Sequence, residues 1–189
     1  MNVLIIPEDF RKDQYMLKPI ISAMFSEIGG SAKIRVCQDP LLGGIGQALK
    51  WERIQEIIDR YKGMIKLFLL CVDRDGIETR KESLTNIENL ALDALPGGKS
   101  LIAENAWQEI EVWVLAGHDL PKGWIWQDLR NEPHPKELYY EPFSKEQNVF
   151  HEPGEGRKTL AIAAAGKYKR MRTLCPELAE MEKRIRQNI

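Results

Sequence analysis

The stretch LFLLCVDRDG, residues 67–76, decides the fold of this chain: an apolar run ends on two aspartates separated by one residue. Such a run is typical of a strand buried on both faces, as in a parallel sheet covered by helices. Asp73 and Asp75 fall where that strand ends, and side chains two residues apart point to the same side. In open α/β sheets, ligands bind at this end of the strands. Paired carboxylates repel unless a cation lies between them, and Mg²⁺ is the usual solution.

The DRDG segment, residues 73–76, can also be only a polar turn. Aspartate and glycine favour turns, and Asp75 could cap the helix that follows. The beginning of the chain favours the metal site. Residues 3–6 form a second apolar, strand-like run, and the acids Glu8 and Asp9 follow it. If the two strands are parallel and adjacent, Glu8, Asp73 and Asp75 converge at one edge of the sheet.

Strand-like and helix-like patterns alternate along the first two thirds of the chain. Predicted strands at residues 3–6, 31–37, 64–72 and 99–103 alternate with predicted helices at 14–28, 47–61, 78–95 and 106–116. This alternation predicts an α/β fold with a mainly parallel four-stranded sheet flanked by helices. The glycine-rich segment 43–46 lacks both the P-loop and the dinucleotide-binding fingerprint, so a flexible turn is favoured over a phosphate-binding loop.

The amino-acid composition of the sequence changes after residue 120. Residues 121–156 are rich in proline and aromatic residues, which predicts an irregular insertion with a single helix starting near Pro135. Its aromatic side chains could stack on bases, although such residues more often pack a small satellite core. Helices are predicted at residues 157–172 and 176–186. We expect an α/β core at residues 1–120, with residues 121–189 packed on it as part of a single domain.

Composition and charge exclude several classes of protein. No apolar run is long enough for a membrane span, and the N-terminus does not resemble a signal peptide. The cysteines Cys37, Cys71 and Cys175 form no CxxC pair, so neither a zinc site nor a disulfide framework is predicted. We therefore expect a cytoplasmic protein. The net charge of −1 gives no global attraction to nucleic acid. Residues 157–172 are basic and lack acids; they could face phosphates or form the solvated side of a helix.

Two further acids, Glu109 and Glu111, lie near the start of the predicted helix 106–116. The helix dipole favours acids in a first turn, which explains both residues without a ligand. Both nevertheless stand among bulky apolar residues, where burying an unpaired carboxylate is costly. A nearby metal ion or lysine would relieve that cost.

Together these residues resemble the TOPRIM pattern of topoisomerases, primases and overcoming-lysogenisation-defect nucleases, in which Glu8 precedes an Asp73-x-Asp75 motif. The chain is more similar still to small stand-alone TOPRIM-like proteins, often encoded beside ATPases in bacterial defence loci. The E-I-E-x-W-L-L-A-D motif of that family is matched by EIEVWVLAG at residues 109–117, with the final acid displaced to Asp119. Its helix-opening lysine is matched by Lys158, and its C-P-x-F/L segment by CPEL at residues 175–178.

The resemblance implies a TOPRIM/Rossmann-like fold and a site that uses Mg²⁺ or Mn²⁺ to hydrolyse phosphodiester bonds in DNA or RNA. It implies Glu8 as general acid/base or ligand, and Lys158 as the group that neutralises charge on the phosphate. The implied catalytic residues are Glu8, Asp73, Asp75 and Lys158; the implied metal ligands are Glu8, Asp73, Asp75, Glu111 and Glu109. Two metal ions would explain so many carboxylates. No tyrosine lies in an obvious nucleophile motif, which favours hydrolysis over a covalent intermediate.

The function expected from this resemblance is a nuclease that works with an ATPase in anti-phage defence, with nucleic acid as a partner and no membrane. An alternative is a non-catalytic partner or effector that keeps the fold and binds an ATPase. Loss of Asp73 or Asp75 would favour that alternative, and both are present. A small-molecule phosphotransferase is a third possibility, although no recognisable nucleotide-binding loop supports it.

Overall fold

The computed structural model describes residues 1–188, and at its centre lies a four-stranded sheet in the order β2-β1-β3-β4. All three neighbouring pairs of strands are parallel. The strands are β1 (Asn2–Pro7), β2 (Lys33–Val36), β3 (Leu67–Asp73) and β4 (Ser100–Ala106). The prediction of an α/β fold with a mainly parallel four-stranded sheet is confirmed.

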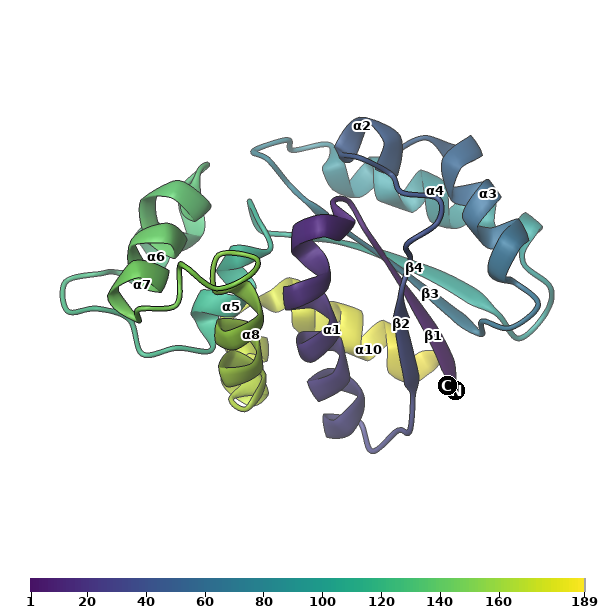
Figure 1. Ribbon diagram of the computed structural model, residues 1–189. Coiled ribbons are helices and arrows are strands. Elements are labelled where there is room, and N and C mark those ends of the chain that lie inside the picture. The colour runs from purple at the N-terminus through teal and green to yellow at the C-terminus, as the bar shows by residue number, and fades with distance from the viewer. Residues whose placement is uncertain (189) are drawn as a thin grey trace.

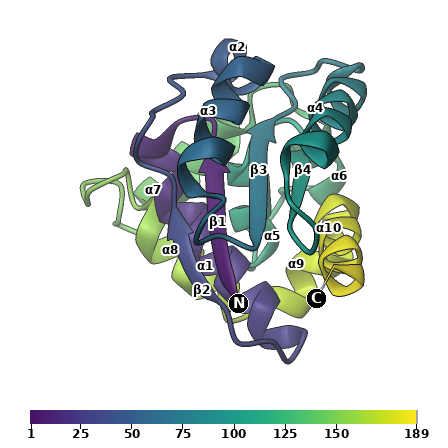
Figure 2. The same ribbon diagram turned by 90° about the vertical axis from the view of Figure 1, so that its right-hand side faces the viewer.

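Helices cover both faces of this sheet (Figures 1 and 2). One face carries α1 (Phe10–Glu27), α5 (Glu111–Ala116), α8 (Arg157–Ala165), α9 (Tyr168–Leu174) and α10 (Pro176–Gln187). The other carries α2 (Ile45–Ala48), α3 (Trp51–Tyr61) and α4 (Arg80–Ala94). Successive strand residues point to opposite faces, so β1 sends Val3 into the first layer and Leu4 into the second. This double burial explains why the central strands are apolar throughout.

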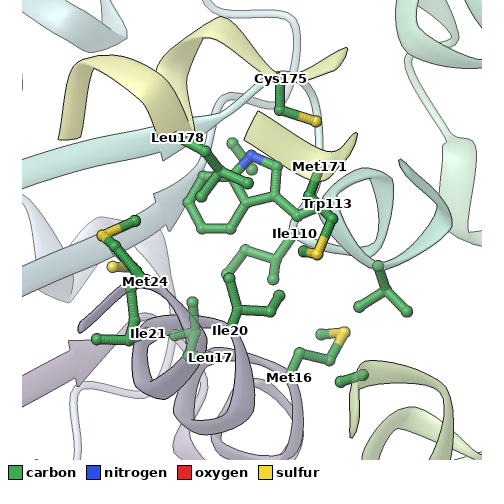
Figure 3. Packing of buried hydrophobic residues seen from close by; sticks show 14 of the residues in the cluster. Met16, Leu17, Ile20, Ile21, Met24, Ile110, Trp113, Met171, Cys175 and Leu178 are labelled. Atoms are coloured by element: carbon green, nitrogen blue, oxygen red, sulfur yellow. The ribbon is translucent and has the colours of Figure 1, made fainter. Parts of the chain in front are cut away.

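The C-terminal helices share one hydrophobic core with the first part of the chain (Figure 3). Trp113 of α5 is fully buried near its centre. Side chains from α1, α9 and α10 pack in the same cluster: Met16, Leu17, Ile20, Ile21 and Met24 from α1, Met171 from α9, Leu178 from α10, and Cys175 between the last two helices. The free energy of apolar burial therefore fixes these helices to the sheet.

The proline-rich segment contains more regular structure than predicted. The helix predicted near Pro135 is present as the π-helical turn η1 (Lys136–Tyr140), which continues into α7 (Glu141–Glu146), and a further helix, α6 (Trp126–Asn131), precedes it. Figure 1 shows α6 and α7 together at one end of the molecule, away from the sheet. The ring of Trp124 packs edge-on against Tyr139 at 4.9 Å, and lies 6.4 Å from Phe143. Phe143 is a buried member of the main hydrophobic cluster, and Trp124 and Tyr139 pack against that cluster, so these aromatic residues extend the main core and do not form a separate satellite core.

Several predicted helix boundaries are wrong. Residues 106–110 are not helical: β4 continues to Ala106, and Gln108 has a left-handed backbone, φ 70°, which a helix cannot contain. The predicted helix 47–61 is divided by the extended residue Lys50, and the predicted helix 157–172 is divided at Lys167, ψ 34°. Helix α1 begins at Phe10, before residue 14, because the side chain of Asp9 caps it.

The outer edge of β4 is covered by side chains of opposite charge. The backbone N–H of Ala103 donates to Glu88 Oε1 at 2.5 Å, and Arg184 Nη1 donates to the carbonyl oxygen of Ala103 at 3.1 Å. Arg184 and Glu88 also form an ion pair with each other. Backbone groups that an edge strand usually leaves unpaired are thereby satisfied. Among the described residues, no helix has both the length and the apolar character needed to cross a membrane.

Candidate functional site

The carboxyl ends of β1 and β3 bring Glu8 and Asp73 together. The two strands are adjacent and parallel, and Pro7 lies opposite Cys71 in their register. Glu8 therefore leaves β1 beside the last residues of β3. Its Oε2 accepts a hydrogen bond from the backbone N–H of Asp73, with an N–O distance of 3.3 Å.

Three carboxylates gather at this edge of the sheet. One side-chain oxygen from each of Asp73, Asp75 and Glu109 lies within 4.8 Å of the other two. Asp73 Oδ1 accepts the backbone N–H of Ile110 at 2.8 Å, and Glu109 Oε2 accepts that of Lys136 at 2.8 Å. Opposite ligands of one Mg²⁺ ion are separated by about 4.2 Å, because each Mg–O distance is about 2.1 Å. Neighbouring ligands of an octahedral ion are only about 3 Å apart, so the three carboxylates would move closer together by side-chain rotation to contact one hard divalent cation.

A tight backbone arrangement brings Asp75 and Glu109 to the same place. Asp75 has a left-handed backbone, φ 52°, immediately after β3. The carbonyl oxygen of Gln108 accepts the N–H groups of Arg74 and Asp75, at 2.8 and 3.1 Å. Its side-chain Oε1 accepts the N–H of Gly76 at 2.8 Å. Gln108 therefore ties the loop after β3 to the loop after β4, and Glu109 follows directly.

A cavity of about 220 Å³ opens at this cluster. Acids and bases line it almost exclusively: Glu8, Asp9, Lys12, Asp13, Asp73, Glu109, Glu111, Lys136 and Arg157. A second hollow of about 430 Å³ adjoins it at Glu8 and Asp9, and includes Phe10, Arg11, Leu41, Gly43 and Gly44. The acidic cavity thus continues into a less polar surface beside β1.

The pKa values of the cavity carboxyls are raised. Burial raises the pKa of Asp73 well above its usual range, and the nearby Glu111, Asp13 and Glu8 add to the effect. Burial also raises the pKa of Glu109 to about 7, against the hydrogen bond from the Lys136 backbone. The pKa of Glu8 is raised by burial, against the hydrogen bond from Asp73. A cation among these groups would offset both the desolvation and the mutual repulsion.

Asp13 lines the cavity although the sequence analysis did not identify it. It is buried, and its Oδ2 accepts the backbone N–H of Asp9 at 2.9 Å. Burial raises its pKa to about 8, with further contributions from the charges of Glu111, Asp9 and Glu8. The signal that could have found it is spacing, because Asp13 precedes the buried Leu17 by one helical turn.

Glu111 reaches the cavity but is bound there by Arg157. The Nε and Nη2 atoms of Arg157 donate to Glu111 Oε1 at 3.1 and 2.6 Å. Arg157 is fully buried, forms a second ion pair with Glu155, and lies 5.3 Å from the ring centre of Tyr140. The geometry therefore favours Glu109 over Glu111 as the third carboxylate beside Asp73 and Asp75.

The structure does not bring Lys158 to the acidic cavity. Lys158 is exposed and lines a different hollow, with Tyr15 and Glu152. Successive helical residues point about 100° apart, so an inward Arg157 turns Lys158 outward. Two lysines do line the cavity: the Nζ of Lys12 lies 3.6 Å from Glu155, and the Nζ of Lys136 lies 3.2 Å from Glu137. Burial opposes the charge of Lys136, but Glu137, Glu111 and Glu109 outweigh it and raise its pKa.

The rest of the basic stretch is engaged in ion pairs. Its partners are acids from other parts of the fold: Lys167 and Arg170 pair with Asp119, Lys169 with Glu27, and Arg172 with Glu182. Asp119, the displaced acid of the EIEVWVLAG motif, is therefore an exposed ion-pair partner, and it does not line the acidic cavity. Most of this stretch thus forms a neutralised helical surface.

The candidate site is therefore built from the ends of β1 and β3, the loop after β4 and the start of η1, together with the first turns of α1, α5 and α8. Their side chains form a half-buried cluster of acids bordered by Lys136, Arg157 and Lys12. Comparison with protein-family models, with curated proteins and with solved structures gave no match to this chain.

Proposed function

We propose that this chain is a metal-dependent nuclease, which hydrolyses phosphodiester bonds of DNA or RNA in a TOPRIM-like manner. The observation that carries the proposal is the cluster of Asp73, Asp75 and Glu109 oxygens within 4.8 Å at the carboxyl end of a central parallel strand. The chemistry of the donors supports Mg²⁺ or Mn²⁺, since both prefer carboxylate oxygen. The resemblance of the motifs to TOPRIM proteins supports the choice of reaction.

Four acids at this edge of the sheet have distinct tasks in the proposed reaction. A divalent cation, when bound, lowers the pKa of a water molecule and stabilises charge on a phosphate. Asp73, Asp75 and Glu109 would hold that cation at the end of β3. Glu8 lies beside them, and burial raises its pKa, the direction that suits a carboxyl acting as a general acid or base.

Lys136 is the cation best placed to neutralise a phosphate in the cavity. Its side chain is 26% exposed, so a ligand can reach Nζ, whereas the Arg157 guanidinium is fully buried. The backbone N–H of Lys136 also donates a hydrogen bond to Glu109. The residue that carries the positive charge therefore also positions one of the candidate metal ligands. We therefore assign to Lys136 the role that the resemblance implied for Lys158.

The test is a cleavage assay on labelled DNA and RNA with Mg²⁺ or Mn²⁺. The variants Asp73→Asn and Glu109→Gln should lose activity by more than about a hundredfold, because each removes a ligand charge. Asp119→Asn is the matched control, since Asp119 is an exposed acid outside the cavity. Binding of Mn²⁺, measured by calorimetry, should weaken in the first two variants and remain unchanged in the control.

The proposal extends to a partner: we infer that the nuclease works with an ATPase in bacterial anti-phage defence, as its resemblance to stand-alone TOPRIM-like proteins suggests. The assay is therefore repeated with the products of neighbouring genes. Cleavage only in their presence would support the partnership. Metal binding without cleavage of any substrate, with or without those proteins, would contradict the nuclease and favour the non-catalytic partner.

A further inference from the structure

Arg74, between the two aspartates of the DRDG turn, is held against an aromatic ring. Its guanidinium carbon lies 3.8 Å from the ring centre of Trp107, which follows β4. Arg130 lies 5.3 Å from the same ring centre, but Glu177 binds it in a bidentate ion pair at 3.1 and 2.7 Å. Two guanidinium groups therefore lie over Trp107. Glu177 neutralises the charge of Arg130, whereas the charge of Arg74 has no such ion pair.

No acid among residues 1–188 forms an ion pair with Arg74. Within residues 1–188, the arginines that form no ion pair are Arg11, Arg35 and Arg74. Asp73 and Asp75 adjoin Arg74 in sequence, yet Asp73 binds the N–H of Ile110 and Asp75 faces Arg80 at 3.5 Å. The charge of Arg74 is thus not neutralised by either of the two aspartates that flank it in the sequence.

The backbone beneath Arg74 is fixed on both sides. Its N–H donates to the carbonyl oxygen of Gln108 at 2.8 Å, and its own carbonyl oxygen accepts from Arg80 Nε at 3.4 Å. The close contact with Trp107 restrains the guanidinium group, and a cation–π contact through the face of the guanidinium leaves its N–H donors free for a ligand. A planar fork of this kind matches the oxygens of a phosphate and loses little entropy on binding.

We propose that Arg74 binds the phosphate backbone of a nucleic acid strand beside the acidic cluster, with Trp107 as the platform that orients it. The inference rests on the proposed function and names one contact by which the nuclease would bind its nucleic acid substrate. Arg11, also unpaired, lines the adjoining hollow near Glu8. Arg11 shares its hollow with Leu41 and Gly43, which follow β2, whereas Arg74 contacts Trp107, which follows β4. A phosphate backbone that contacts both arginines would cross the acidic cluster.

The test is the affinity for a labelled single-stranded oligonucleotide, measured by fluorescence anisotropy with Ca²⁺ in place of Mg²⁺ to suppress cleavage. Arg74→Met keeps an apolar stem on Trp107 but removes the charge. It should weaken binding about tenfold, and should reduce the slope of log affinity against log salt by about 0.7 for one lost single-strand phosphate. Arg74→Lys should retain part of the affinity. Arg35→Met, an exposed unpaired arginine on β2, is the control and should bind as the unaltered protein does.

The outcomes separate this inference from the proposed function. Unchanged affinity and salt slope in Arg74→Met would overturn it, even if the protein cleaves nucleic acid. A lower melting temperature with unchanged affinity would also overturn it, because Arg74 would then only stabilise the loop. Weakened binding in Arg74→Met but not in Arg35→Met would support it, including in the case that no cleavage is found.

Discussion

Replacing Asp13 with asparagine should stabilise the metal-free protein at neutral pH. Burial of the Asp13 carboxyl raises its pKa to about 8, and the charges of the neighbouring acids add to the effect. Asparagine has nearly the same shape and its Oδ1 can still accept the N–H of Asp9. The substitution removes the ability to ionise and leaves the packing almost unchanged.

The size and sign of this effect follow from proton linkage. The folded protein keeps the Asp13 proton up to about pH 8, whereas the unfolded chain releases it near pH 3.9. Between these values the folded state binds more protons, so its free energy of unfolding falls as the pH rises. A difference of about four pKa units corresponds to at most about 5 kcal/mol, which is fully expressed only above pH 8.

The assay is thermal unfolding in EDTA at pH 5 and at pH 8, followed by circular dichroism. For a chain of this size, 1 kcal/mol corresponds to about 2–4 °C, so Asp13→Asn should melt on the order of 10 °C higher at pH 8. The gain at pH 5 should be much smaller. Asp93→Asn, at an exposed position of α4, is the control and should show no such dependence. An equal gain at both pH values, or a loss at pH 8, would refute the reasoning.

Three further perturbations probe the site and its support. Gly117→Ala should cost roughly 1–3 kcal/mol of unfolding free energy, because its Cβ would lie 2.4 Å from that of Ala164; Gly63→Ala, with open space around it, is the control in denaturant titrations. Lys136→Ala should reduce the turnover of nucleic acid at saturating metal, while Lys158→Ala should change it little, and equal effects in a steady-state assay would contradict our assignment. Binding of Mg²⁺ below pH 8 should release protons, since the cavity carboxyls have raised pKa values, and calorimetry in two buffers of different ionisation enthalpy measures the number released.

The sheet and the meeting of its acids could be predicted because both depend on patterns along single strands. The apolar run 67–72 is buried on both faces, as its composition requires. Glu8 and Asp73 follow neighbouring parallel strands, so the sheet order alone brings them together. Local sequence therefore determines which acids lie at the end of a strand, and the order of the strands determines which of these acids lie together.

The parts that could not be predicted depend on helix phase and on contacts between distant segments. Arg157 points inward and Lys158 outward, a difference of one residue that the basic pattern does not reveal. Asp13 was overlooked because the predicted helix began at residue 14, which hid the face that it shares with Leu17. Glu109 joins Asp73 only because Gln108 leaves the helical conformation to bind the DRDG turn.

The two edges of the sheet resist self-association in different ways. At β4, Glu88 and Arg184 already occupy the outward backbone groups of Ala103, so an incoming strand would have to break an ion pair to hydrogen-bond there. At β2, the exposed positions are Lys33 and Arg35. Two copies that met edge to edge along β2 would bring like charges together, which disfavours growth of a continuous sheet between identical chains. The architecture that exposes a row of strand ends to a ligand thus also protects the chain from polymerising through its strand edges.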